Sequence, residues 1–346
     1  MSISASIHAL HETAVPERVG DRTSARLADV KELVAREMAE VEALVGAHVE
    51  KGVAPATDSA RHLFASGGKR VRPTAVLLAC ACFGAVHGVV RDLAAAAELV
   101  HMATLLHDDV IDDSDQRRGR PTSRRIWGNA VSVLAGDLLL VEALRLASAA
   151  SPRTWSELVG TLGKLVDGEV VQLRGRLAVT LAETTYFEIV RGKTASLFEW
   201  ALRAGAREGG APEAFVDDLG TFGAHLGVAF QLVDDVLDYD GDASVTGKAL
   251  LADLHEGKVT LPLVLASQGD PRIEPLVAAV RRHDESSAAA AAEIATRVRA
   301  SGACDGVRDR ARAETHAALA ALSRIPECRA REVLFEVARS MTARVM

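Results

Sequence analysis

The stretch Leu105–Pro121, LLHDDVIDDSDQRRGRP, joins a long apolar run to a cluster of acidic side chains. Arg117 and Arg118 follow the cluster closely. Its five aspartates are Asp108, Asp109, Asp112, Asp113 and Asp115. If the helix that enters this stretch continues, Asp108 and Asp112 lie one turn apart on the same face, with Asp109 beside them. Carboxylates at this spacing repel one another, so the cluster requires either a cation or full solvation.

Two interpretations of the cluster compete. A solvated acidic helix end is the ordinary explanation of such a run. However, the helix dipole favours acidic residues in the first turn of a helix, and these follow several apolar turns. Mg²⁺ prefers oxygen ligands, retains several waters and completes its coordination shell with substrate phosphates. The position of the cluster therefore favours a site for a divalent cation.

The same spacing returns in FQLVDDVLDYDGD, residues 230–242. Asp234, Asp235 and Asp238 repeat the pattern of the first cluster 126 residues later, and they also end a long apolar helical run. Solvation explains one such cluster easily but two matching clusters poorly. We therefore predict that both contribute to one site for metal ions and a polyanion.

The composition favours helices. Hydrophobic residues make up 49% of the 346-residue chain and aromatic residues only 4%, while Ala, Leu, Val, Glu and Arg are abundant. A formal charge of −7 argues against a nucleic-acid partner, because such proteins carry a basic excess. We expect residues 1–22 to be a loose N-terminal leader and residues 23–346 to be a single all-α domain.

No segment resembles a signal peptide or a transmembrane helix. We therefore expect a cytoplasmic protein without a membrane span. The four cysteines do not have the spacing of zinc ligands, so we expect buried thiols and no structural disulfide. They are Cys80, Cys82, Cys304 and Cys328.

Basic and polar residues recur at chain breaks and on the helix before the first aspartates. GGKRVRP, residues 67–73, places Lys69 and Arg72 beside a glycine pair and before a helix, which suits either an anion site or a solvated loop. His101 lies seven residues before Asp108 on the same helical face. It could be either a histidine of the apolar core or a residue of the functional site. Lys193 and Thr194 interrupt an otherwise helical segment.

Together these motifs resemble those of the trans-type polyprenyl (isoprenyl) diphosphate synthases, over Leu63 to the C-terminus. They occur in the order GGKRVRP, HMATLLHDDVIDDSDQRRGRP, GEVVQL, KTASLF, FQLVDDVLD and GKALLADLHEGKVTLP. The resemblance implies an all-α bundle of ten or more helices around a deep central cavity, the isoprenoid synthase fold, and a homodimer. It also implies Mg²⁺-assisted, head-to-tail condensation of an allylic diphosphate with isopentenyl diphosphate.

The resemblance assigns roles to individual residues. It implies metal binding by Asp108, Asp109, Asp112, Asp234, Asp235 and Asp238, with Asp109, Asp235 and Asp238 in support. It implies isopentenyl diphosphate binding by Lys69, Arg72, His101 and Arg118. It implies allylic diphosphate binding by Arg117, Lys193, Lys248 and Lys258. Lys193, Thr194 and Gln231 are the expected catalytic residues, and the last two present oxygen dipoles to the developing carbocation. Ala249–Leu251 depart from the proline and glycine that the family usually carries after Lys248.

Ala103 and Thr104 are the expected determinants of product length. They lie on the helical turn before Asp108, where short-chain enzymes of the family carry aromatic residues. Small side chains leave the path of the growing chain open, which favours a medium or long product of six or more isoprene units. Bulky residues within 138–144 could stop the chain earlier, so a geranylgeranyl or farnesyl product is the alternative.

Two further alternatives come from other classes of protein. A class I terpene cyclase shares the first aspartate cluster, but its second metal motif uses Asn, Ser or Thr and Glu, where this chain has aspartates. A non-catalytic subunit of a heteromeric synthase typically lacks some of the acidic or basic residues, whereas this chain retains them.

Overall fold

The computed structural model describes residues 22–177, 181–240, 252–281 and 286–342. These residues are helical almost throughout, and the strands among them are one short antiparallel pair, β1 (Gln116–Arg117) and β2 (Arg120–Pro121). The all-α prediction is confirmed. Among the described helices, none combines the length and the apolar character that a membrane span requires.

The chain groups into two compact units. Unit 1 comprises the described parts of residues 1–159, 197–223 and 319–340, and unit 2 those of 160–196, 224–318 and 341–346. Unit 1 contains α2 (Arg22–Val49), α3 (Ala56–Ala65), α4 (Val71–Ala81), α5 (Gly88–Ile111), the β1–β2 hairpin, α6 (Ser123–Trp127), α7 (Asn129–Ala147) and most of α10 (Ser196–Glu208) and α18 (Arg329–Thr342). Unit 2 contains α9 (Glu183–Val190), the π-helical turn η1 (Arg191–Ala195), α13 (Ala252–His255), α14 (Leu261–Gly269), α15 (Ile273–Val280) and α16 (Ser287–Ala300). Three more helices are divided between the two units: α8 (Pro152–Leu177), α11 (Glu213–Asp240) and α17 (Ala303–Leu322).

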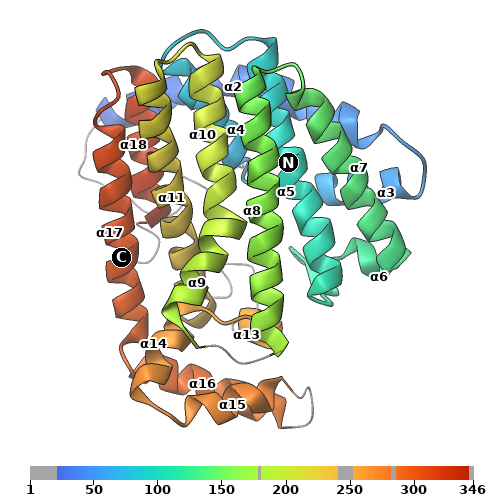
Figure 1. The fold of residues 1–346 in the computed structure, drawn as a ribbon, viewed down its shortest axis with the longest axis vertical. Coiled ribbons are helices and arrows are strands. Elements are labelled where there is room, and N and C mark those ends of the chain that lie inside the picture. Colours follow the sequence, from blue (N-terminus) through green and yellow to red (C-terminus); the bar gives the residue numbers. More distant parts are fainter. Residues whose placement is uncertain (1–21, 178–180, 241–251, 282–285, 343–346) are drawn as a thin grey trace. The chain divides into compact units, whose positions relative to one another are not determined.

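Helix α5 is the central helix of unit 1. Its side chains Leu93, Leu99 and Leu106 are fully buried, and the helix packs against α2, α4 and α7. Helices α5 and α7 lie side by side (Figure 1). Gly136 of α7 leaves room for the His107 ring of α5, because a Cβ atom at Gly136 would lie 2.3 Å from His107 Nε2. The apolar run before the first aspartates is therefore a core helix.

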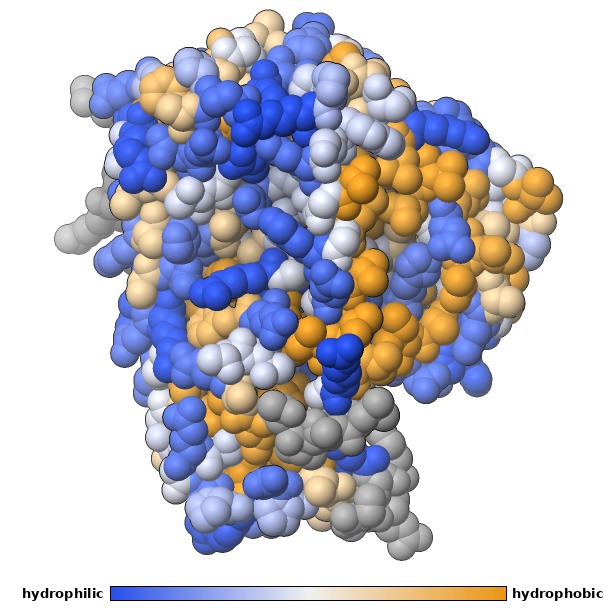
Figure 2. All heavy atoms as spheres, viewed as in Figure 1, coloured by the Kyte–Doolittle hydropathy of each residue, from blue (hydrophilic) through white to orange (hydrophobic). Residues whose placement is uncertain are grey.

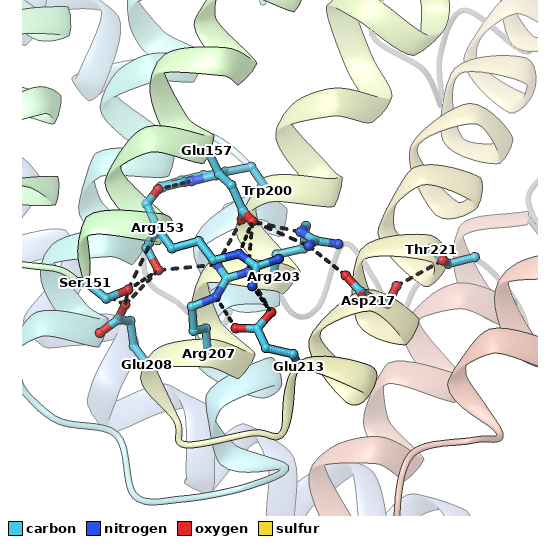
Figure 3. Close-up of polar contacts among 11 residues, drawn as sticks. Ser151, Arg153, Glu157, Trp200, Arg203, Arg207, Glu208, Glu213, Asp217 and Thr221 are labelled. Carbon is cyan, nitrogen blue, oxygen red and sulfur yellow. Dashed lines mark hydrogen bonds and ion pairs between the residues drawn. The ribbon is translucent and has the colours of Figure 1, made fainter.

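A polar network joins the first turn of α8 to α10 (Figure 3). The carboxylate of Glu208 accepts hydrogen bonds from the Ser151 amide at 3.1 Å and from the Thr154 hydroxyl at 2.7 Å. The Arg207 guanidinium donates two parallel hydrogen bonds of 2.9 Å to Glu157. Bidentate pairs of this kind fix orientation as well as distance. The start of α8 is therefore held to α10 by charged hydrogen bonds in addition to apolar packing.

Unit 2 has its own apolar core. Its helices α14, α15 and α16 pack on one another, with Leu261, Ile273 and Ile294 fully buried. In the same unit, α8 and η1 approach at two glycines. A Cβ atom on Gly168 would lie 2.9 Å from the Lys193 amide nitrogen, and one on Gly192 would lie 2.8 Å from the Lys164 carbonyl oxygen. The glycine of the GEVVQL motif thus has a packing role.

Several local predictions differ from the structure. The residues after the first aspartate cluster form a tight hairpin, in which Arg118 and Gly119 both have positive φ, as a type I′ turn requires. Helix α15 was not predicted, because it is short and begins just after an Asp-Pro pair. The expectation of buried cysteines is correct for Cys80 and Cys304, whereas Cys82 and Cys328 are half-buried. The single domain and the deep central cavity stay predictions.

Candidate active site

The first aspartate cluster ends α5. Asp112 caps the C-terminus of the helix, and its amide donates a hydrogen bond of 2.8 Å to the Asp108 carbonyl oxygen, so the helical spacing holds to the last turn. Asp108 and Asp112 are both half-buried. Asp113 then turns the chain out of the helix with a φ of 52°. The predicted one-turn relationship between Asp108 and Asp112 is present in the structure.

Asp109 has a different environment from its neighbours. It is 1% exposed, and one of its oxygens accepts a hydrogen bond of 2.9 Å from Arg117 Nε and forms an ion pair of 2.9 Å with Nη2 of the same guanidinium. A buried carboxylate needs such a partner, because desolvation otherwise penalises its charge. Arg117 belongs to the hairpin strand β1, so this pair fixes the hairpin against the end of α5.

The remaining aspartates of the stretch are exposed. Asp113 and Asp115 form ion pairs with Arg124, at 3.1 and 3.8 Å. Exposed pairs such as these contribute little stability. The five aspartates thus fall into three groups. Asp108 and Asp112 are half-buried, Asp109 is a buried anchor, and the other two are exposed to solvent.

Arg72 lies in the first turn of α4. Its guanidinium stacks over the ring of Phe198 at 4.8 Å, and burial lowers its pKa to about 10. Its Nε is buried and has no hydrogen-bond partner. A desolvated guanidinium with an unused donor is a favourable group for binding an anion.

His101 lies among arginines. Burial, and then the positive charges of Arg72 and Arg118, lower its pKa well below the usual value. Arg117 and Arg70 act in the same direction. The imidazole is therefore neutral at pH 7 and can donate one hydrogen bond without adding charge. Three of the four residues predicted to bind isopentenyl diphosphate, namely Arg72, His101 and Arg118, thus lie in one region of unit 1. The fourth, Lys69, lies three residues before Arg72.

Glu98, which the sequence analysis did not single out, and Arg70 of the GGKRVRP stretch hold this region together. Glu98 of α5 is 4% exposed and accepts a hydrogen bond of 2.6 Å from Arg70. Arg70 has a φ of 49° and precedes α4 directly. Arg118 of the hairpin donates a hydrogen bond to the Gly67 carbonyl. An acidic residue within an apolar helix signals a buried ion pair, so Glu98 could have been recognised from the sequence.

The second aspartate cluster ends α11, in unit 2. Asp235 is 1% exposed and accepts hydrogen bonds from the Tyr186 hydroxyl at 2.6 Å and from Gln231 Nε2 at 2.8 Å. Burial, and then the charge of Asp253, raise the pKa of Asp235 to about 7. Asp234 is half-buried and Asp238 is 4% exposed. In both clusters, then, the second aspartate is buried and bonded to the protein.

The predicted catalytic residues lie beside this cluster. Thr194 donates a hydrogen bond of 3.1 Å to Gln231, which itself donates to Asp235. Lys193 forms an ion pair with Glu169 of α8. Lys193 and Thr194 both belong to the π-helical turn η1, a feature that is frequent at functional sites. The predicted interruption of the helix at these two residues is confirmed.

One of the two predicted loop lysines can be placed. Lys258 forms an ion pair of 2.5 Å with Glu256, and its Nζ lies 3.9 Å from Asp253. Lys248 and Ala249–Leu251 lie outside the described residues. The expected product-length residues are on α5, where Ala103 is 2% exposed and the Thr104 hydroxyl donates to the His101 carbonyl at 2.8 Å.

The described residues contain no group of three or more His, Cys, Asp or Glu side chains arranged to hold a metal ion. Asp108 and Asp112 provide two half-buried carboxylates one turn apart, on the exit turn of a rigid helix. Mg²⁺ is usually held by one or two carboxylates and by substrate phosphates, not by a cage of protein ligands. The donor set therefore fits Mg²⁺ bound together with a diphosphate.

Known proteins match the chain over most of its length. Residues 54–297 match the polyprenyl synthetase family. An all-trans-nonaprenyl-diphosphate synthase (geranyl-diphosphate specific) of Rhodobacter capsulatus is 36% identical over 323 residues, which are 92% of this chain and 98% of that protein. The octaprenyl diphosphate synthase of Escherichia coli (strain K12) is 34% identical over 314 residues, 90% of this chain and 97% of that protein.

The fold agrees with a solved structure. A polyprenyl synthase from Caulobacter crescentus CB15, complexed with calcium and isoprenyl diphosphate, matches with a TM-score of 0.86 and 37% identity. The match covers 95% of this chain and 99% of that one. The predicted isoprenoid synthase fold is confirmed. The chain therefore belongs to the polyprenyl synthetase family and is a transferase of prenyl groups.

Proposed function

We propose that the protein condenses isopentenyl diphosphate head-to-tail with an allylic diphosphate, and that it releases a trans-polyprenyl diphosphate of six or more isoprene units. One feature that recurs in both units supports this proposal most directly. Each aspartate cluster ends a buried helix, and each is accompanied in its own unit by cations suited to a diphosphate. The relatives that make octaprenyl and nonaprenyl diphosphates support the product class.

Asp108, Asp112 and Asp234 are the proposed metal ligands, with Asp109, Asp235 and Asp238 in support. Bound Mg²⁺ would neutralise the negative charge of the leaving diphosphate. The buried carboxylate of Asp109 accepts a hydrogen bond from Arg117, and that of Asp235 accepts hydrogen bonds from Tyr186 and Gln231. These bonds suit a supporting role, in which the two aspartates orient the ends of their helices. The calcium in the Caulobacter relative supports a divalent cation, and the hard oxygen ligands with few protein donors favour Mg²⁺.

Lys69, Arg72, His101 and Arg118 are the proposed ligands of isopentenyl diphosphate. The unused donor of Arg72 and the concentration of arginines around a neutral His101 favour an anion here. Phosphate oxygens accept several charge-assisted hydrogen bonds from such a group. These four residues bind the diphosphate of the second substrate directly, without a metal ion.

Arg117, Lys193, Lys248 and Lys258 are the proposed ligands of the allylic diphosphate. The pairs are already formed within the protein: Arg117 with Asp109, Lys193 with Glu169 and Lys258 with Glu256. Such pairs hold the cations in place, so a bound diphosphate meets donors that are already oriented. Thr194 and Gln231 present their oxygen atoms to the positive charge that develops when the allylic diphosphate ionises. The departing diphosphate then accepts the proton lost after carbon–carbon bond formation.

Ala103 and Thr104 are the proposed floor beneath the reacting carbon. Ala103 is buried, so a larger side chain there would compete for space with neighbouring atoms. It would also compete with the growing product. Small residues at this turn leave room for a chain of many isoprene units.

We also propose a homodimer formed through α7. Exposed apolar side chains gather on this helix (Figure 2). They include Ile126 just before it and Val133, Leu134 and Val141 on it. Together with residues 51–56, α7 lines a groove of about 590 Å³ whose walls are largely apolar. A patch of this kind on a protein of 346 residues is typical of an interaction surface. The cytoplasmic location and the single domain over residues 23–346 stay predictions.

Incubation of the purified protein with labelled isopentenyl diphosphate, Mg²⁺ and geranyl, farnesyl or geranylgeranyl diphosphate tests the proposed reaction. Chromatographic sizing of the dephosphorylated products should give linear alcohols of six or more isoprene units. A cyclic hydrocarbon would contradict the proposed reaction and support a terpene cyclase. Products that stop at farnesol or geranylgeraniol would contradict the proposed product length. No turnover with any primer would support a non-catalytic subunit.

A further inference from the structure

Arg281 of unit 2 is not among the residues assigned above to the proposed reaction. It caps the C-terminus of α15, a helix whose Val277 and Val280 are each 2% exposed in the apolar core. Its Nη2 atom donates hydrogen bonds of 2.9 Å to the Gly175 carbonyl and of 3.3 Å to the Gly257 carbonyl. The two acceptors lie 106 and 24 residues before Arg281 in the sequence. One guanidinium therefore joins two segments that are distant along the chain.

The first acceptor belongs to the last turn of α8. Gly175 lies just before the end of this helix at Leu177, and the carbonyls of a last turn have no partner within their own helix. A cation at this end also interacts favourably with the helix dipole. The same helix carries Glu169, which pairs with the proposed diphosphate ligand Lys193. Arg281 is therefore bonded to a helix that already holds one of the proposed allylic diphosphate ligands.

The second acceptor lies in the turn that carries Lys258, residues 254–258, which we call the Lys258 turn. Helix α13, which leads into it, has only four residues, and a helix of this length is not stable alone. The turn forms a Schellman motif, in which Gly257, with a φ of 75°, and Lys258 donate amide hydrogen bonds of 3.0 and 2.8 Å to carbonyls of α13. Leu254, which is 2% exposed, anchors the start of the turn in the core, and Arg281 holds the Gly257 carbonyl near its end.

The bond from Arg281 acts next to the charged atoms of the Lys258 turn. Gly257 directly precedes Lys258, so the position of its carbonyl limits where the Lys258 side chain begins. The Lys258 ammonium pairs with Glu256 at 2.5 Å and lies 3.9 Å from Asp253. A shift of the turn would therefore displace the cation and its acidic neighbours together.

We propose that Arg281 is a positioning residue, which fixes the Lys258 turn relative to the end of α8 so that Lys258 meets the allylic diphosphate in a defined place. This role rests on the proposed function, because it concerns that substrate. Without Arg281 the turn samples more positions, and ordering it again reduces the affinity for the diphosphate. Binding of isopentenyl diphosphate should be affected less, because its proposed ligands lie in unit 1.

Steady-state kinetics of Arg281→Met test this role. Met keeps much of the side-chain volume but removes the donors, so the KM for the preferred allylic primer should rise about 10-fold, with little change in the KM for isopentenyl diphosphate. Arg281→Lys restores a cationic donor and should recover part of the loss. Arg272→Met is the matched control at the other end of α15, where the side chain is 71% exposed and pairs with Asp270, and both KM values should stay unchanged. An unchanged KM for the primer in Arg281→Met, or equal rises for both substrates, would overturn the proposal.

Hydrogen–deuterium exchange tests the bond to the turn without any turnover. In Arg281→Met the amides of Gly257 and Lys258 should exchange about 10-fold faster than in the wild type, because the turn opens more readily. The amides of α14 and the whole of Arg272→Met should exchange as in the wild type. Unchanged exchange at the Lys258 turn in Arg281→Met would overturn the proposal. A wild type without turnover would instead refute the proposed function, and exchange at this turn would still decide whether Arg281 holds it.

Discussion

Arg117 Nε donates a hydrogen bond of 2.9 Å to one oxygen of Asp109, and Nη2 forms an ion pair of 2.9 Å with the same oxygen, so the pair joins the hairpin to the last turn of α5. The carboxylate is 1% exposed, whereas the arginine keeps part of its surface in solvent. Asp108 lies directly before Asp109, and Arg118 directly follows Arg117. The pair therefore fixes both a proposed metal ligand and a proposed diphosphate ligand.

Loss of this pair should cost stability. Arg117→Ala leaves the Asp109 charge buried without its guanidinium, and we expect a decrease of about 3 kcal/mol in the free energy of unfolding, measured by urea denaturation. Arg124→Ala is the control, since its partners Asp113 and Asp115 are exposed, and it should change the same quantity by less than about 1 kcal/mol. Equal effects of the two substitutions would show that Asp109 is not an anchor.

The hydroxyl of Tyr186 should matter for the second cluster. Tyr186→Phe removes the 2.6 Å hydrogen bond to Asp235, so we expect about 2 kcal/mol lower stability and a higher Mg²⁺ concentration for half-maximal activity. Tyr239→Phe removes only a weak contact of 3.3 Å with Thr260 and is the matched control. If both variants require the same Mg²⁺ concentration as the wild type, Tyr186 does not position the cluster.

Stability should depend on pH through His101. Its pKa in the folded protein is well below the usual value, so below about pH 6.5 the unfolded chain binds a proton that the folded protein does not. The free energy of unfolding should therefore fall as pH decreases below 6.5, by up to about 1.4 kcal/mol per pH unit. Urea titrations from pH 8 to pH 5 measure this slope. His101→Asn should flatten the profile, while replacement of the exposed His87 should leave it unchanged. A wild-type profile that matches His101→Asn would contradict a neutral imidazole at His101.

Product length should respond to Ala103. Ala103→Phe places an aromatic ring on the turn before Asp108, and we expect the main product to lose several isoprene units. Overpacking of this buried position also costs stability, typically about 1–3 kcal/mol, so the assay should be run well below the melting temperature. Thr104→Ala enlarges the same floor and should leave the product equal or longer. An unchanged product from a folded Ala103→Phe variant would place the floor elsewhere.

The proposed dimer should depend on Leu134, which is 60% exposed on α7. Leu134→Glu introduces a charge into the apolar groove, and we expect sedimentation equilibrium to show a shift from dimer to monomer. Ala85→Glu adds the same charge at an exposed site outside the groove and should leave the assembly unchanged. A wild-type monomer, or a Leu134→Glu dimer as stable as the wild type, would contradict this surface.

The sequence predicts the features that depend on local pattern. The apolar period of α5 and α11 and the sudden change to aspartates at their ends indicate both helices and both clusters. The glycines and basic residues of 67–73 likewise mark the turn before α4. Nothing local in the sequence reveals that Arg70 adopts a left-handed conformation and that α4 begins at Val71.

Contacts between distant residues could not be predicted in this way. Tyr186 reaches Asp235 across 49 positions, and Arg72 stacks on a ring 126 residues away. These contacts depend on which helices pack together, and neither hydrophobic period nor residue spacing encodes that. Burial shows the same limit, because the cysteine spacing suggested four buried thiols, whereas Cys82 and Cys328 are half-buried.

The rate of isopentenyl diphosphate incorporation as a function of Mg²⁺ concentration tests the central claim most directly. Asp108→Ala and Asp234→Ala should each lower the maximal rate by at least about 100-fold, with the helical circular dichroism signal retained. Asp113→Ala is the control from the same stretch, because this exposed aspartate pairs only weakly with Arg124 at the surface, and it should keep near-normal activity. Near-normal, Mg²⁺-dependent turnover in either Asp108→Ala or Asp234→Ala would contradict the proposal that the two clusters bind the metal ions of one reaction.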